Sequence, residues 1–173
     1  MNVLTKFKPI KTFVFDVDGV LTDGNLLILA DGQQARTMNI KDGYALQLAI
    51  KKGYRVLVIS GGNADAVKAR LEKLGVIDVF MNVTNKKEKL TEYAENLQLK
   101  WDEILFMGDD IPDHEAMQLV GLPCCPADAA IEIKQVAGYI APRDGGQGCV
   151  RDVIEKVLKL NSHWIMDTTV SSK

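Results

Sequence analysis

Two aspartates, Asp16 and Asp18, stand two residues apart directly after a β-prone run at 11–15. Carboxylates at the end of a buried strand cannot both be buried without a proton or a cation that neutralises them. A hard divalent ion such as Mg²⁺ binds carboxylate oxygens, backbone carbonyls and water, and would remove this conflict. A solvated turn before a hairpin is the alternative that the motif alone leaves open.

A second acidic group follows another β-prone run, at 103–107, and comprises Asp109, Asp110 and Asp113. On its own this group could simply cap the next helix, because aspartate is favoured at helix starts. In a parallel sheet, however, the carboxyl ends of the strands share one edge. We therefore expect Asp109 to lie near Asp16, where the two would supply anionic ligands for one Mg²⁺, an ion that binds phosphate oxygens readily.

A pattern suited to phosphate binding stands between the two acidic groups. Ser60, Gly61 and Gly62 follow the apolar run at 55–59 and precede a helix-like segment. A hydroxyl group beside closely approaching backbone N–H groups can cradle a phosphate, although an N-capped turn would have the same residues. Lys86 opens a later helix-like segment, where a solvated lysine is the usual case. The four motifs stand in one order along the chain, each at a strand end or a helix start, and this order weighs against the separate explanations.

The elements that must position these residues alternate along the chain. Continuous apolar runs bounded by turn residues are typical of strands buried on both faces of a parallel sheet. Strands are expected at 11–15, 55–59, 79–81, 103–107, 122–125 and 139–140, and helices at 42–52, 64–74, 86–97, 112–120 and 150–160. This alternation predicts an α/β fold with a doubly wound, mostly parallel, Rossmann-like sheet, whose ligands bind beyond the carboxyl ends of the strands.

One segment departs from this alternation. Asp31 and Gly32 separate two β-prone runs, a typical hairpin signal, so we expect a protruding β-hairpin over about residues 24–40. The hairpin is too small to be a cap domain. Residues 1–160 are expected to form a single domain, and residues 161–173 a C-terminal tail.

The composition excludes several classes of protein. The 173 residues are 47% hydrophobic and 25% charged, with a net charge of -2, so no basic excess indicates a nucleic-acid or membrane-surface partner. No apolar run is long enough to cross a bilayer, and no signal peptide is expected at the N-terminus. The three cysteines match neither a metal-binding spacing nor a disulfide framework, so we expect a cytoplasmic protein.

The four motifs, in this order, resemble those of the haloacid dehalogenase superfamily of phosphotransferases. They read DVDGVLTD, VISGG, a lysine at position 86 and GDDIPD, and the match covers nearly the whole chain. More closely, the segments DVDGVLTDG, NIKDGYAL, RLEKLGV and GGQGCVRDV are similar to the bacterial 3-deoxy-D-manno-octulosonate 8-phosphate phosphatases. The resemblance implies a capless, homotetrameric, Mg²⁺-dependent phosphatase of lipopolysaccharide sugar synthesis, which acts on a small phosphorylated sugar acid.

The resemblance also implies a role for each motif residue. Asp16 would be the nucleophile that forms an aspartyl-phosphate, and Asp18 would be the general acid and then the general base. Ser60 and Lys86 would hold the phosphoryl oxygens while charge shifts in the transition state. The Mg²⁺ ligands would be Asp16, Asp18 through its backbone carbonyl, and Asp109, supported by Asp110 and Asp113.

Contacts to the substrate are implied in the same way. They comprise Asp18, Asn39, Ile40, Lys41, Asp42, Gly43, Ser60, Gly61, Arg70 and Lys86. Two positions depart from the family pattern: Gly62 stands where many relatives have an arginine, and Gln47 where many have a basic residue. These departures leave open a nine-carbon sugar acid 9-phosphate as the substrate. A non-catalytic oligomerisation module of the same fold is a further alternative, against which the intact Asp16 and Asp18 argue.

The hairpin bears on assembly. Its apolar residues 26–29 have no helix of their own to cover them, and an isolated hairpin is only marginally stable in water. Hairpins from several subunits could bury one another, which agrees with the homotetramer that the resemblance implies. Folding of the hairpin back onto its own domain is the alternative.

Overall fold

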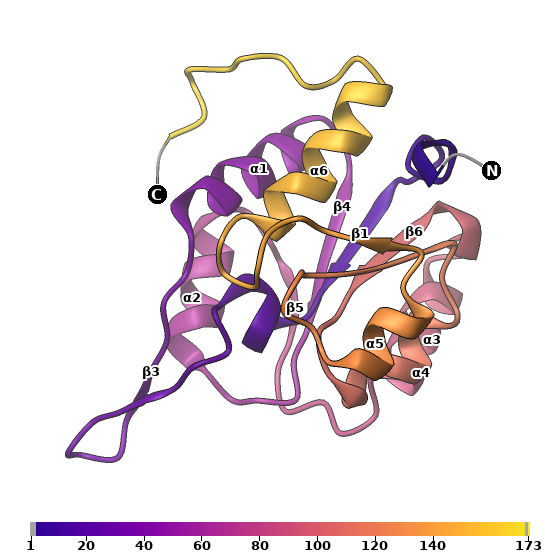
Figure 1. Cartoon of the computed structure of the whole chain (residues 1–173). Coiled ribbons are helices and arrows are strands. Elements are labelled where there is room, and N and C mark those ends of the chain that lie inside the picture. The colour runs from indigo at the N-terminus through magenta and orange to yellow at the C-terminus, as the bar shows by residue number, and fades with distance from the viewer. Residues whose placement is uncertain (1–2, 172) are drawn as a thin grey trace.

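Six parallel strands form the central sheet of the computed structural model, which describes residues 3–171 and residue 173 (Figure 1). The strands are β1 (Thr12–Phe15), β4 (Arg55–Ile59), β5 (Asp78–Phe80), β6 (Ile104–Met107), β7 (Leu122–Cys125) and β8 (Tyr139–Ile140). Their order in space is β5-β4-β1-β6-β7-β8, so the chain winds outwards on both sides of β1. Every neighbouring pair is parallel, which confirms the predicted doubly wound sheet.

Helices cover both faces of this sheet. One face packs against α1 (Ile40–Lys51), α2 (Asp65–Lys73) and α6 (Cys149–Leu160). The other face packs against α3 (Lys86–Asn96), α4 (His114–Met117) and α5 (Ile131–Val136). In β1, Phe13 and Phe15 point to the first set of helices and Val14 points to the second, and all three are fully buried. Both faces of the strands are therefore apolar because a layer of helices buries each of them.

Two helices differ from the prediction. The segment expected as one helix at 112–120 is a 3-10 turn over Ile111–Asp113 followed by the single turn of α4. Asp110 and Asp113 form a capping box, in which the side chain of each accepts a bond from the backbone of the other. This box fixes a tight 3-10 turn where a regular α-helix was expected to begin. The α5 helix was not expected, because its six residues are too few to give a clear helical period and Ile133 is the one among them that is fully buried.

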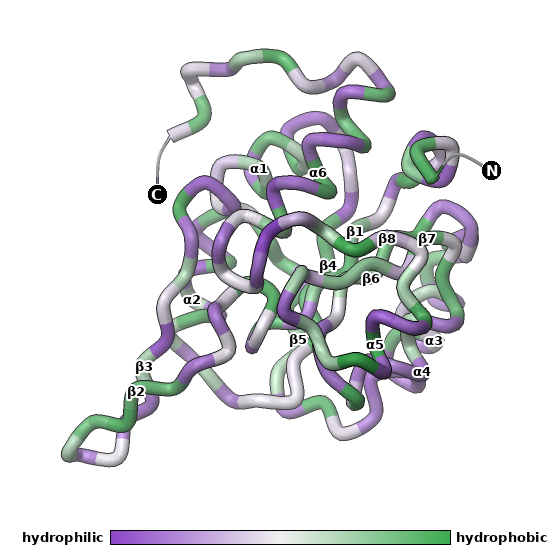
Figure 2. Tube along the Cα trace, in the orientation of Figure 1, coloured by the Kyte–Doolittle hydropathy of each residue, from purple (hydrophilic) through white to green (hydrophobic). Residues whose placement is uncertain are grey.

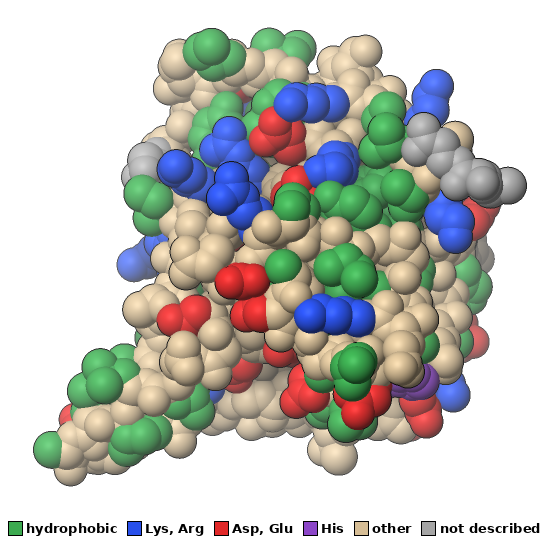
Figure 3. All heavy atoms as spheres, viewed as in Figure 1, with side chains coloured by type: hydrophobic (Ala, Val, Ile, Leu, Met, Phe, Trp, Pro, Cys, Tyr) green, Lys and Arg blue, Asp and Glu red, His purple; other side chains and the backbone are tan. Residues whose placement is uncertain are grey.

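The hairpin is present and projects away from the sheet (Figure 1). Its strands, β2 (Leu27–Ile28) and β3 (Gln34–Ala35), pair antiparallel, and a bridge between Thr22 and Met38 closes its base. Leu26, Leu27, Ile28 and Leu29 are 40–64% exposed, and they form an apolar tip that is visible in Figures 2 and 3. The hairpin does not fold back onto its own domain. No described helix is long and apolar enough to cross a membrane.

The segment after α6 lies along α1. Asp167 accepts a bond from Lys51 Nζ at 2.6 Å, and its backbone carbonyl accepts one from the Tyr44 hydroxyl at 3.3 Å. The Trp164 ring packs against Tyr44 with 6.1 Å between the ring centroids. The predicted tail therefore makes specific contacts with the main body of the chain.

Candidate active site

The register of the sheet brings the predicted motifs together. The last residue of β1 pairs in register with β4 on one side and β6 on the other, so the residues that follow these strands meet at one edge. They line a pocket of about 290 Å³ at that edge. Its lining includes Asp16, Asp18, Ser60, Gly61, Lys86, Asp109, Asp110 and Asp113.

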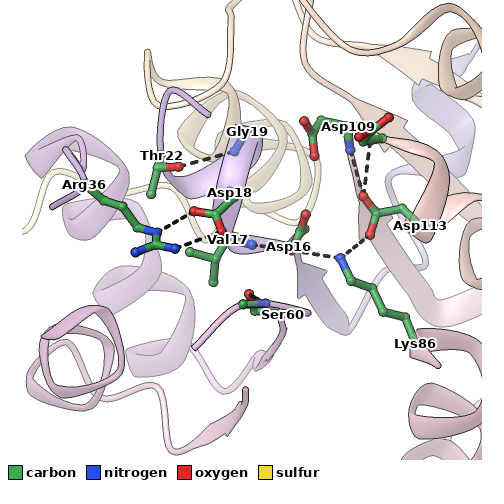
Figure 4. A network of polar contacts seen from close by, with 12 residues as sticks. Asp16, Val17, Asp18, Gly19, Thr22, Arg36, Ser60, Lys86, Asp109 and Asp113 are labelled. Atoms are coloured by element: carbon green, nitrogen blue, oxygen red, sulfur yellow. Dashed lines mark hydrogen bonds and ion pairs between the residues drawn. The ribbon is translucent and has the colours of Figure 1, made fainter. Parts of the chain in front are cut away.

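A buried lysine joins two of these carboxylates (Figure 4). Lys86 begins α3, and its Nζ lies 2.9 Å from Asp16 Oδ1 and 2.6 Å from Asp113 Oδ1. Burial alone would lower the pKa of Lys86, but the negative charges of Asp113 and Asp16 more than offset burial and raise it. Lys86 is therefore a fixed positive charge beside the Asp16 carboxylate.

The remaining acidic groups are short of positive charge. Burial, followed by the charges of Asp16, Asp113 and Asp110, raises the pKa of Asp109 to about 8. Burial and Asp113 raise the pKa of Asp16 to about 6, although Lys86 opposes them. The Oδ1 atom of Asp109 is buried and has no hydrogen-bond partner among the described residues. A cation between Asp16 and Asp109 would remove this repulsion.

The donor atoms suit a hard divalent ion. One carboxylate oxygen from each of Asp16, Asp109 and Asp113 lies within 4.8 Å of the others. Both oxygens of Asp113 already accept hydrogen bonds, from Lys86 Nζ and from the Asp109 N–H. Asp113 thus holds its neighbours in place, and Asp16 and Asp109 have oxygen atoms free to bind a metal. An all-oxygen site of this kind fits Mg²⁺.

Gly19 allows the two acidic motifs to approach each other. Its φ is +84°, and a Cβ atom at this position would collide with the carboxylate of Asp109. The turn over Val17–Leu21 is held by Thr22, whose hydroxyl oxygen accepts a bond from the Gly19 N–H at 3.3 Å. A glycine in the first motif is therefore required for Asp109 to reach the site.

The loop after β4 faces the same pocket. Ser60 is buried, and its Oγ accepts a bond from the Gly62 N–H at 3.2 Å. This contact curls the loop so that the Ser60 hydroxyl and the Gly61 backbone line the pocket beside Asp16. A hydroxyl group and a lysine beside a carboxylate can hold the oxygens of a phosphoryl group.

The side chain of Asp18 has a partner that sequence reasoning missed. Arg36, just after β3, places its Nε 2.6 Å from Asp18 Oδ1 and its Nη2 3.3 Å from Oδ2 (Figure 4). Nothing in the sequence links these positions, which lie far apart along the chain. The one available signal was the hairpin itself, because the bridge between Thr22 and Met38 at its base returns the chain after β3 to the turn that follows β1.

The predicted substrate-binding residues separate into three groups, of which the first, Asp18, Ser60, Gly61 and Lys86, lines the pocket at the strand ends. Ile40 and Arg70 line a second pocket of about 830 Å³ between the hairpin and α2. Asn39, Lys41, Asp42 and Gly43 line neither this pocket nor the one at the strand ends. Asn39 instead caps α1, where its Oδ1 accepts a bond from the Lys41 N–H at 2.8 Å.

Asp42 lies between two helices. Its side chain is buried, and its Oδ1 accepts a bond from the Arg151 N–H at the start of α6, at 2.7 Å. Burial raises the pKa of this carboxyl group to about 6. Asp42 fastens α1 to α6. Gly43 allows the Arg70 side chain to pack closely against α1, because a Cβ atom at position 43 would lie 3.4 Å from Arg70 Nη2.

The sequence is similar to known phosphatases. The family of haloacid dehalogenase-like hydrolases matches residues 71–151. The 3-deoxy-D-manno-octulosonate 8-phosphate phosphatase KdsC of Salmonella typhi is 32% identical over 157 residues, which cover 91% of this chain and 84% of that protein. KdsC of Escherichia coli K12 is 31% identical over the same shares of both chains.

Solved structures agree with these relatives. The crystal structure of the Yersinia pestis phosphatase of the same name has a TM-score of 0.90 and 28% identity, and covers 93% of this chain and 87% of its own. The enzyme of Moraxella catarrhalis, in complex with a magnesium ion, a phosphate ion and KDO, has a TM-score of 0.88 and 29% identity over 91% of each chain. The resemblance predicted from the four motifs is confirmed. The chain belongs to the haloacid dehalogenase-like hydrolases and, within them, to the family of the KdsC phosphatases.

Proposed function

We propose that this phosphatase hydrolyses 3-deoxy-D-manno-octulosonate 8-phosphate to the free sugar acid and phosphate, with Mg²⁺ as its cofactor, in lipopolysaccharide sugar synthesis. The observation that carries the proposal is the single pocket in which Asp16 and Asp109 lie beside Lys86 and Ser60. The names of the relatives support the substrate, and the magnesium ion in the Moraxella structure supports the cofactor.

The reaction begins at Asp16. An oxygen of its carboxylate attacks phosphorus, the bond between phosphorus and the ester oxygen breaks, and an aspartyl-phosphate forms. Lys86 and the Ser60 hydroxyl bind the phosphoryl oxygens and stabilise the charge that develops on them. Lys86 already lies 2.9 Å from Asp16, so little rearrangement is needed to place this positive charge.

Asp18 acts on the leaving group and then on water. Its carboxyl group donates a proton to the departing sugar oxygen, and its carboxylate later takes a proton from the water that attacks the aspartyl-phosphate. That attack releases phosphate and restores Asp16. The Asp18 side chain lines the same pocket as Asp16, as this exchange of roles requires.

Asp16, Asp109 and the Asp18 backbone carbonyl would hold the metal, with Asp110 and Asp113 in support. Mg²⁺ held there would neutralise the crowded carboxylates and would supply a positive charge for a phosphoryl oxygen. Asp113 fixes the backbone of this loop through the Asp109 N–H, at 3.0 Å. Asp110 contributes by capping the turn that follows.

A nine-carbon sugar acid 9-phosphate is the second candidate substrate, and Gly62 is the observation that favours it. Gly62 lines the pocket and offers no cation to the substrate. Gln47, the other departure from the family pattern, lies on α1, where its Nε2 donates to the Ser171 carbonyl at 2.9 Å. Gln47 therefore has less bearing on the choice between the substrates.

Turnover of a panel of phosphorylated sugar acids tests the proposal. With Mg²⁺ present, kcat/KM for the eight-carbon 8-phosphate should exceed that for the nine-carbon 9-phosphate by about tenfold or more, a difference typical of a few missing polar contacts. Excess chelator should abolish turnover and Mg²⁺ should restore it, whereas Ca²⁺ should not, because its longer and more variable coordination misplaces the phosphate. A reversed preference would transfer the proposal to the nine-carbon substrate, and full activity in chelator would contradict the metal site.

We also propose that the chain assembles through its hairpin, as a homotetramer. The four apolar residues at the tip are too exposed for a segment that serves only its own domain. Leu27 and Ile28 are neighbours in β2, so their side chains point to opposite faces. At least one of them should meet another subunit.

Charged residues at both positions, Leu27→Glu with Ile28→Lys, should dissociate the assembly. Burying unpaired charge in the interface would cost several kcal/mol. Light scattering should show monomers. These monomers should still hydrolyse p-nitrophenyl phosphate, because the motif residues all lie at the sheet edge of one chain. They should lose most of their kcat/KM for the sugar-acid phosphate. Substituting the exposed Gln33 in the hairpin turn by glutamate is the matched control. A dissociated double variant with undiminished sugar-acid activity would show that one chain suffices.

A further inference from the structure

The two catalytic carboxylates are held by different cations. Asp16 has Lys86 beside it and accepts a bond from the Val17 N–H at 2.7 Å. Asp18 has Arg36, whose Nε and Nη2 bind the two carboxylate oxygens at 2.6 and 3.3 Å. Within the described part of the chain, Arg36 is the one group that hydrogen-bonds to the Asp18 carboxylate. The orientation of Asp18 therefore depends on a residue outside the four motifs.

Arg36 is the anchored member of this pair. Its side chain is only 6% exposed, whereas that of Asp18 is 37% exposed. A third contact, from Arg36 Nη1 to the Gln34 carbonyl at 3.2 Å, fixes the guanidinium to the hairpin backbone. A planar guanidinium with two bonds to one carboxylate fixes its direction as well as its position. Asp18 remains open to the pocket while Arg36 holds it from behind.

The glycine that departs from the family pattern makes room for this pair. A Cβ atom on Gly62 would lie 3.1 Å from Asp18 Oδ2 and 3.6 Å from Arg36 Nη2. A long side chain at position 62 would have to share this space with the ion pair. The small residue at position 62 therefore leaves the space that the ion pair occupies.

We propose that Arg36 is a positioning residue, which aims the Asp18 carboxyl group at the leaving-group oxygen of the substrate. The inference rests on the proposed role of Asp18 as general acid. Without Arg36, the side chain of Asp18 would rotate freely at the pocket mouth. A displacement of about 1 Å is enough to cost on the order of a hundredfold in rate.

A purely structural role for Arg36, as a pin for the hairpin, makes a different prediction. Loss of a contact that only holds the hairpin would slow the hydrolysis of all substrates alike. Misdirected proton transfer slows only substrates whose leaving group needs a proton from Asp18. Phenyl phosphate and p-nitrophenyl phosphate have nearly the same shape, but p-nitrophenolate is the far better leaving group and gains little from an acid. The parameter kcat/KM reports the steps from substrate binding to departure of the leaving group. The later role of Asp18 as base in hydrolysis of the aspartyl-phosphate therefore does not affect it.

The experiment measures kcat/KM for both esters, with Mg²⁺, in the full-length enzyme and four variants. Asp18→Asn is the reference for loss of the acid. Arg36→Gln removes the charge, and Arg36→Lys keeps the charge without the two-point contact. Arg55→Gln is the matched control, because Arg55 also pairs with an aspartate, Asp78 at 3.7 Å, at the opposite end of the sheet. Thermal melting of each variant reports on folding.

Arg36→Gln should lower kcat/KM for phenyl phosphate by roughly 30- to 100-fold and for p-nitrophenyl phosphate by less than about threefold. For Arg36→Lys, kcat/KM for phenyl phosphate should lie between the values for Arg36→Gln and wild type. Arg55→Gln should leave the ratio of the two kcat/KM values, p-nitrophenyl phosphate over phenyl phosphate, unchanged. An equal loss on both esters in Arg36→Gln and Arg36→Lys, or no loss, would overturn the inference. If Asp18→Asn itself leaves the ratio at its wild-type value, Asp18 is not the acid, and the proposed mechanism fails together with the inference. If kcat/KM for p-nitrophenyl phosphate divided by that for phenyl phosphate rises in Asp18→Asn but not in the Arg36 variants, Asp18 is still the acid and only the role of Arg36 is excluded.

Discussion

Replacing Asp16 by asparagine should lower turnover by at least about a thousandfold while the fold stays intact. An amide oxygen carries no negative charge, so it cannot attack phosphorus to form the covalent intermediate, and it is a poorer ligand for Mg²⁺. The substitution removes the pair with Lys86, but it also relieves the repulsion that raises the pKa of Asp109. These effects oppose each other, so the melting temperature should move by only about 5 °C or less.

Phosphate release and thermal melting test this expectation together. Asp102→Asn is the matched control, because Asp102 is exposed in the turn before β6, at the amino end of the strand that carries Asp109 at its other end. The control should retain wild-type turnover. Turnover of Asp16→Asn within tenfold of wild type, measured with Mg²⁺, would exclude Asp16 as the nucleophile.

Replacing Lys86 by methionine should damage both stability and activity. Methionine has a similar length but no charge, so Asp16 and Asp113 would lose their shared cation in a buried site. Breaking a buried ion pair by removing one partner costs about 3–5 kcal/mol. Turnover should fall by on the order of a hundred- to a thousandfold, because one donor to the transition state is lost.

The stability of this variant should also depend on pH in a defined direction. Burial and the charge of Asp113 already raise the pKa of Asp16, and Lys86 opposes this rise together with the Val17 N–H. Without Lys86 the folded state binds protons more tightly than the unfolded chain. Its stability is then greatest at low pH and is lost as the pH rises through the raised pKa. Melting curves of the Lys86→Met variant should therefore shift to lower temperature between about pH 5 and about pH 8.

The neighbouring lysine is the control for both effects. Lys87 is about half exposed and pairs with Glu115 at 3.4 Å on the surface, a contact worth at most about 1 kcal/mol. Lys87→Met should therefore melt and turn over much like wild type. If Lys86→Met costs no more than Lys87→Met in either measurement, the buried triad does not have the role assigned to it.

The sequence alone was sufficient to predict the sheet and the core of the site, because both depend on local signals. Each motif directly follows an apolar strand or begins a helix, and parallel strands end at a common edge, so Asp16, Ser60 and Asp109 could be placed together without coordinates. Lys86 followed in the same way as the first residue of its helix. A residue whose place depends on one adjacent element is predictable in this manner.

Residues placed by long-range packing were not predictable. Arg36 reaches Asp18 only because the hairpin returns to its own base, and the buried Asp42 side chain accepts a bond from the start of α6. Neither contact leaves a pattern in the neighbouring sequence. A family resemblance transfers positions, whereas the direction of a side chain depends on what packs against it.

The order of the strands has a consequence for how the protein is made on the ribosome. The strand β1 emerges first, yet it lies in the middle of the sheet, and its neighbours β4 and β6 are translated much later. A nascent chain therefore carries a strand with two unpaired edges, and such edges favour aggregation or recruit chaperones. Because Asp109 and Asp113 follow β6, a half-synthesised chain contains Asp16, the proposed nucleophile, without the rest of its acidic cluster. Phosphatase activity can therefore begin only after most of the sheet has been translated and assembled.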